Sequence, residues 1–129
     1  MTMIKARLLL VVFGIFLPYL ARVPRGAEWL EQYTDAGLAG WVLFSVLNAI
    51  AWGAILAISF RYKRLASLIA PCLLGFGYLA WSHGTLDLST NPNAPIALVI
   101  IPVYALVPIG VGGVIGYIID RMLRRNEAA

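Results

Sequence analysis

The chain has 129 residues, of which 61% are hydrophobic and only 12% are charged. Soluble domains carry about 25% charged residues, so this composition excludes an ordinary water-soluble domain and indicates an integral membrane protein. The net charge of +4 would suggest nucleic-acid binding in a soluble protein, but the charges here flank apolar segments, and we expect no nucleic-acid partner.

Four apolar segments are long enough to cross a lipid bilayer. They cover residues 4–21, 37–60, 65–82 and 96–119. At 1.5 Å per residue, their helices would be roughly 27 to 36 Å long, against a hydrocarbon core of roughly 30 Å. The sequence therefore predicts an all-α, polytopic membrane protein in which residues 1–129 form one domain of four transmembrane helices.

The first apolar segment also has the layout of a secretory signal peptide. Lys5 and Arg7 precede an uncharged stretch, as in the basic start of such peptides. A cleavage site needs small residues, however, and Tyr19 places an aromatic ring two positions before Ala21. We therefore expect an uncleaved first helix.

The connection that follows, residues 22–36, contains a short amphipathic stretch. Trp29, Leu30 and Tyr33 fall on one face at helical spacing. This pattern is typical of a short helix that lies in the membrane interface, and we expect such a helix on the periplasmic side.

Three carboxylates occupy the opposite face of this short helix. Glu28, Glu31 and Asp35 form a charged cluster that topology does not explain. The simpler interpretation is a face exposed to solvent. The alternative is a periplasmic docking surface for a cationic segment of a partner.

The second apolar segment carries four small residues at a strict spacing of four. Ser45, Ala49, Gly53 and Ala57 form this stripe. Helices in lipid gain little hydrophobic energy by associating, so small side chains favour packing because they let backbones approach closely. We expect the stripe to pack against another helix of this chain, and a helix of another protein is the alternative.

Asn48 lies in the middle of the same segment. A buried amide in hydrocarbon needs a hydrogen-bond partner, so we expect an interhelical hydrogen bond that fixes packing. The alternative is a polar site or pathway that Asn48 shares with Trp52, four residues later, and with Tyr104 of the fourth segment.

The third segment follows Arg61-Tyr62-Lys63-Arg64, a connection so short that the second and third helices must be antiparallel neighbours. Pro71 is expected to bend the third helix, and Cys72 is expected to be a small buried apolar residue. After this helix, residues 91–95 form a turn-rich Asn-Pro-Asn-Ala-Pro stretch that is predicted not to be helical.

The fourth segment contains Pro102 and Pro108, which should kink or locally unwind the helix. A broken helix at membrane depth is typical of transporter binding sites. Gly112 and Gly116 favour close helix packing in the same segment.

Residues that carry chemistry are few. Cys72 is the single cysteine and His83 the single histidine, which excludes an intramolecular disulfide, a paired-cysteine zinc motif and a histidine-rich metal site. The four segments have no ionisable residue well inside their ends, although ion-coupled transport almost always needs one. We expect no enzymatic activity, no catalytic residue, no cofactor and no metal, and we expect His83 to form a hydrogen bond at the interface.

Lysine and arginine counts predict the orientation. Eight of these residues fall on one side of the predicted bundle and two, Arg22 and Arg25, on the other. Because cytoplasmic loops carry the excess of basic residues, we expect both termini in the cytoplasm and the spans in a bacterial-type inner membrane. The eight are Lys5, Arg7, Arg61, Lys63, Arg64, Arg121, Arg124 and Arg125.

Two hypotheses for function follow from these patterns. The first is a non-catalytic protein that packs against another membrane protein, as an accessory subunit or as an immunity-type protein that blocks a pore-forming toxin. Its partners would be the bilayer and either another membrane protein or further copies of the chain. The second is a small channel, holin-like pore or transporter subunit, in which Asn48 and the kinked fourth helix line the path.

Overall fold

The computed structural model describes residues 1–90 and 92–129. Over these residues the chain is 84% helix and has no strand, which confirms the predicted fold class. Asn91, part of the predicted turn-rich stretch, lies outside the described residues. The elements, with η for 3₁₀ helices, are α1 (Met3–Leu20), η1 (Val23–Arg25), α2 (Ala27–Thr34), α3 (Gly37–Ser59), η2 (Leu65–Leu68), α4 (Ile69–Thr85), η3 (Ala94–Ile96) and α5 (Ala97–Ala128).

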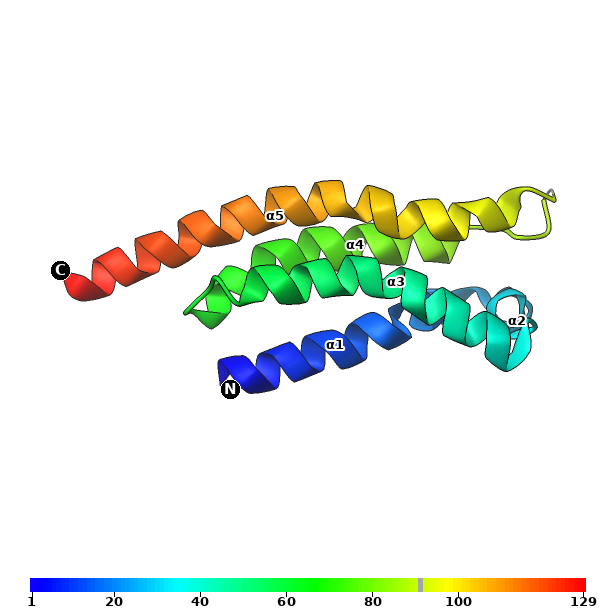
Figure 1. The fold of residues 1–129 in the computed structure, drawn as a ribbon, viewed down its shortest axis with the longest axis horizontal. Coiled ribbons are helices and arrows are strands. Elements are labelled where there is room, and N and C mark those ends of the chain that lie inside the picture. The colour runs from blue at the N-terminus through cyan, green and yellow to red at the C-terminus, as the bar shows by residue number, and fades with distance from the viewer. Residues whose placement is uncertain (91) are drawn as a thin grey trace.

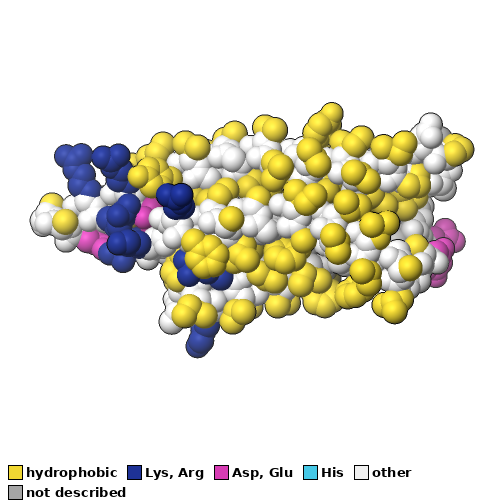
Figure 2. All heavy atoms as spheres, in the orientation of Figure 1, with side chains coloured by type: hydrophobic (Ala, Val, Ile, Leu, Met, Phe, Trp, Pro, Cys, Tyr) yellow, Lys and Arg dark blue, Asp and Glu magenta, His cyan; other side chains and the backbone are white. Residues whose placement is uncertain are grey.

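The four long helices run side by side along the length of the molecule (Figure 1). Each is long and apolar enough to cross a membrane, so the chain is a multi-pass membrane protein. Both termini and the connection between α3 and α4 lie at one end, called here the basic end, and α2 lies at the other, called the acidic end. Figure 2 shows Lys and Arg gathered at the basic end and a broad hydrophobic surface between the two ends.

The predicted boundaries hold closely for the first two spans and less well for the others. The third span begins as the 3₁₀ turn η2 and becomes α-helical at Ile69, and the fourth continues to Ala128, well past residue 119. Two glycines with positive φ, Gly26 at 99° and Gly37 at 68°, flank α2. Glycine adopts this conformation without steric cost, so the chain can turn sharply on each side of the short helix.

The prolines behave differently from the sequence predictions. Pro71 lies in the first turn of α4, where a backbone N–H has no helical acceptor, so proline starts this helix and does not bend it. Pro95 likewise stands at the start of η3, within residues predicted not to be helical. α5 passes both Pro102 and Pro108 as one uninterrupted helix, so the predicted local unwinding was wrong.

The core is built from apolar residues of all four long helices, and α4 and α5 approach each other most closely at glycines. A Cβ atom on Gly112 would lie 2.6 Å from Pro71 Cα and 2.7 Å from the carbonyl oxygen of Ala70. Gly116 similarly lies against the carbonyl oxygen of Ser67. The core residues are Leu10, Leu17, Ala51, Ile55, Phe76, Leu79, Ile101, Ala105 and Ile109.

We predict that Gly112→Ala lowers the free energy of unfolding by about 1–3 kcal/mol, because the added methyl group meets the α4 backbone, which cannot move aside cheaply. Gly110→Ala, on the same helix, is the matched control, since a Cβ atom there has nothing within 4 Å. Thermal unfolding in detergent measures both variants, and equal melting temperatures would contradict the close contact between α4 and α5.

Candidate functional site

Two charged side chains are fully buried, one near each end of the bundle. Arg22 follows α1 at the acidic end, and Asp120 lies in α5 at the basic end; both are 0% exposed. On the sequence alone, Arg22 counts only as a topological charge and Asp120 does not stand out. Both residues organise the polar contacts of their end of the molecule.

The Arg22 guanidinium joins three segments. Its Nε donates to the carbonyl oxygen of Trp29 at 2.7 Å, and Nη2 donates to Oε1 of Gln32 at 2.8 Å. Nη1 donates to the carbonyl oxygens of His83 and Leu86, each at 2.7 Å. One side chain therefore links α1, α2 and the carboxyl end of α4.

Aromatic rings enclose the same guanidinium. Its carbon lies 3.9 Å from the ring centroid of Tyr33 and 4.6 Å from that of Trp29, within the range of cation–π attraction. The Tyr33 hydroxyl is 2.8 Å from His83 Nδ1, and burial raises the pKa of Tyr33, so its hydroxyl stays protonated. His83 thus forms a hydrogen bond near the membrane boundary, although its partner is Tyr33 and its ring is buried.

Gln32 extends this network to the connection after α4. Its Nε2 donates to Oδ1 of Asp87 at 3.1 Å, and its Oε1 accepts from the backbone N–H of Leu88 at 2.9 Å. Hydrogen bonds from the Ser89 hydroxyl and N–H lower the pKa of Asp87, which keeps this carboxylate ionised as an acceptor.

Asp120 links different segments of the chain at the basic end, as Arg22 does at the acidic end. Its Oδ1 accepts from the backbone N–H groups of Lys63 at 2.9 Å and Arg64 at 2.8 Å, and from the Ser67 hydroxyl at 2.9 Å. Its Oδ2 lies 3.0 Å from Nε of Arg124, one turn later in α5. The carboxylate therefore ties the connection between α3 and α4 to α5.

Asn48 joins α3 to α1. It is 2% exposed, and its Nδ2 donates to the carbonyl oxygen of Gly14 at 2.8 Å. This is the interhelical hydrogen bond that the sequence analysis favoured. Trp52 packs directly over Gly14, whereas Tyr104 is 62% exposed on α5, so the structure does not bring Tyr104 into a buried site with Asn48.

The stripe of small residues on α3 is only partly covered by the chain. Ser45 and Ala49 are half-buried, and Ala57 is exposed. A Cβ atom on Gly53 would meet nothing within 4 Å. The expected packing of the whole stripe inside the bundle was therefore wrong for Gly53 and Ala57, and we call these two positions the open stripe.

The three carboxylates near α2 are all exposed, but they have different surroundings. Asp35 lines a cavity of about 570 Å³ between the start of α3 and the start of α5, together with Tyr33 and Phe44. Glu28 and Glu31 do not line it.

The polar centres described above all bind the chain's own backbone or side chains. Within residues 1–90 and 92–129, no group of three or more His, Cys, Asp or Glu side chains is placed to hold a metal ion. Comparison of this chain with protein-family models, curated proteins and solved structures finds no match.

We predict that Arg22→Lys lowers the free energy of unfolding by roughly 2 kcal/mol or more. A single ammonium group cannot reach the carbonyls of both α2 and α4, and each buried carbonyl left without a donor costs roughly 1–3 kcal/mol. Titration with a denaturing detergent measures the change. Arg25→Lys, at an exposed position three residues later, should stay within about 0.5 kcal/mol of the parent protein; an equally mild effect at Arg22 would count against its role as a link.

Proposed function

We propose that this chain is a non-catalytic membrane protein that acts by packing an outward helix face against another membrane-inserted protein. Its role would be that of an accessory subunit or of an immunity-type protein that blocks a pore-forming toxin. The observation that carries this proposal is the open stripe on α3, where the space outside Gly53 is empty and Ala57 is exposed.

The open stripe supports packing with a partner because of where its neighbours lie. Gly53 and Ala57 are one helical turn apart, the spacing of small residues that lets two backbones meet in lipid. Bulkier side chains lie on the same face toward the start of the helix, with Val46 64% and Ile50 43% exposed. Gly53 and Ala57 therefore form a shallow notch in an apolar helix face, into which a helix of another protein would fit.

The polar interior favours this role over conduction. A small channel, holin-like pore or transporter subunit was expected to use Asn48 and a kinked fourth helix. The Asn48 amide nitrogen is bonded to Gly14 of α1, and α5 is continuous. The guanidinium of Arg22 and the carboxylate of Asp120 are also engaged within the chain, which supports a structural use of these groups.

The proposal predicts that Gly53→Leu abolishes recovery of the partner and leaves the isolated chain as stable as before. The new side chain would enter open space in the bundle but would block a partner's backbone. The measurement is co-purification from the native membrane in mild detergent, with mass spectrometry of the bound proteins and a melting curve of the variant.

Gly110→Leu is the matched control, because Gly110 also faces open space but lies on α5. It should retain the partner at the level of the parent protein. Loss of the same protein from both variants, or its retention by both, would contradict a partner surface at the open stripe.

We further propose that the bundle lies in a bacterial-type inner membrane with its basic end in the cytoplasm. Both termini and the connection between α3 and α4 lie at that end (Figure 1). These are the segments that carry eight of the ten Lys and Arg residues, which supports this orientation through the positive-inside rule.

This orientation is tested by labelling single cysteines in intact cells, in a Cys72→Ser background. Lys63→Cys and Asn126→Cys should be protected from a membrane-impermeant maleimide, and Glu31→Cys and Thr90→Cys should react; all four positions are exposed. The reverse pattern would overturn the orientation, and labelling of positions 63 and 90 from the same side would contradict the arrangement of spans.

A further inference from the structure

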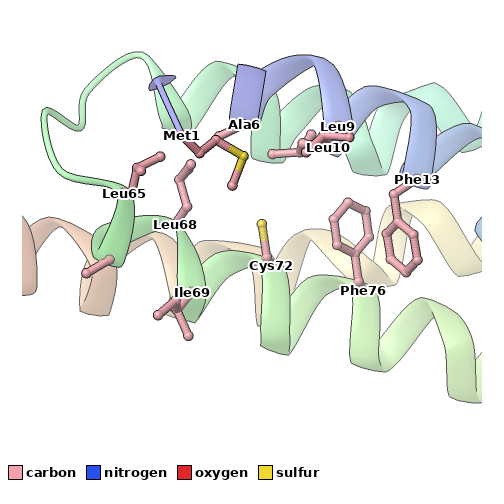
Figure 3. Close-up of a pocket in the computed structure, with 11 residues that line it drawn as sticks. Met1, Ala6, Leu9, Leu10, Phe13, Leu65, Leu68, Ile69, Cys72 and Phe76 are labelled. Carbon is pink, nitrogen blue, oxygen red and sulfur yellow. The ribbon is translucent and has the colours of Figure 1, made fainter. Parts of the chain in front are cut away.

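A groove separates α1 from α4 at the basic end of the bundle (Figure 3). It has a volume of about 570 Å³, within the range of small-molecule sites. We call it the α1/α4 groove, and its lining is apolar throughout. The residues used below are Leu10 and Phe13 of α1, Leu65 of η2, and Cys72 and Phe76 of α4.

The depth of the α1/α4 groove corresponds to about one leaflet. From Leu65 to Phe76 the chain rises roughly 17 Å at 1.5 Å per residue, about half of the roughly 30 Å hydrocarbon core. At the inner end, the rings of Phe13 and Phe76 meet edge to face with centroids 5.0 Å apart. A smaller hollow of about 430 Å³ shares Cys72 and both phenylalanines with the groove and extends to Ala80. A partner's transmembrane helix would need the full thickness, whereas an acyl chain needs only one leaflet.

Two lysines are close in sequence to residues that line the groove. Lys5 lies on α1 one turn before Leu9, which lines the groove, and Lys63 lies two residues before Leu65. Both side chains are exposed, and among the described residues neither ammonium group has an ion-pair partner. Their flexible stems allow both ammonium groups to reach the headgroup level.

Three arginines of this end are already engaged, whereas Arg61, Arg121 and Arg125 are exposed. Arg7 donates to Ser59 and lies over the ring of Phe60. Arg64 pairs with Glu127, and Arg124 pairs with Asp120 as described above. Lys5 and Lys63 therefore add unpaired positive charge close to residues that line the groove, which favours a negatively charged headgroup.

We propose that the α1/α4 groove binds one anionic phospholipid. An acyl chain lies along the groove against Leu10, Phe13 and Cys72, and the headgroup phosphate is held between Lys5 and Lys63. The site is on a different face from the open stripe on α3, so it does not depend on the proposed partner.

Native mass spectrometry tests this proposal on the whole protein, supplied in detergent with equal amounts of phosphatidylglycerol and phosphatidylcholine of the same acyl chains. The expected result is one retained lipid, predominantly phosphatidylglycerol. Lys5→Gln with Lys63→Gln should lower the preference for phosphatidylglycerol by about fivefold for each lysine. Arg121→Gln with Arg125→Gln removes the same charge from exposed positions at the same end and should keep the preference.

A second pair of variants tests the acyl chain. Cys72→Phe fills the middle of the groove and should reduce retention of both lipids, whereas Leu74→Phe, at a 36% exposed position that lines neither the groove nor the adjoining hollow, should not. Equal retention of the two lipids by the parent protein would overturn the proposal, as would an unchanged preference in the lysine variant. A dimer of the chain without lipid, cross-linked through Cys72, would assign the groove to a second copy. Should Cys72→Phe fail to fold, the lysine variants alone decide the outcome.

Discussion

The structure depends on how the backbone groups at the two ends of α4 are satisfied next to lipid. A helix leaves N–H groups without partners at its start and carbonyls without partners at its end, and unpaired groups are costly in a bilayer. In the connection that leads through η2 into α4, the N–H groups of Lys63 and Arg64 donate to the carboxylate of Asp120. At the other end of α4, the carbonyls of His83 and Leu86 accept from the guanidinium of Arg22. Each charge also has the sign that the helix dipole favours at that end.

These two contacts explain the arrangement of the other helices. Arg22 follows α1 and Asp120 belongs to α5, so α4 is held from both sides at opposite ends. With its ends held, α4 can lie close enough to α5 for Gly112 to touch the backbone at Pro71. The α3 helix is joined separately to α1 through Asn48. The buried polar groups therefore act as links between specific pairs of helices.

Much of the fold can be predicted from the sequence because the length of an apolar run is a local property; the spans at 3–20 and 37–59 follow directly from it. The roles of Arg22 and Asp120 cannot be predicted in this way, because their hydrogen-bond partners are distant in the sequence. The partners lie up to 64 residues from Arg22 and up to 57 residues from Asp120. Helix geometry explains why part of the small-residue stripe is left uncovered by the chain. A spacing of four residues advances by about 40° around a helix of 3.6 residues per turn, so the stripe from Ser45 to Ala57 winds around α3 and cannot face one neighbour throughout.

The buried polar groups are hydrogen-bonded within the bundle, whereas the open stripe and the α1/α4 groove are not covered by the chain. This difference affects how such a small protein would bind its partners. Side chains that are hydrogen-bonded within the bundle hold the helices in one arrangement, and a surface held in this way loses little conformational entropy when a partner binds. The proposed protein partner at the open stripe on α3 and the proposed lipid between α1 and α4 would occupy separate faces. Neither requires α4 to give up its contacts with Arg22 or Asp120. Lipid occupancy would instead fill the gap beside α1, the helix that Asn48 joins to α3.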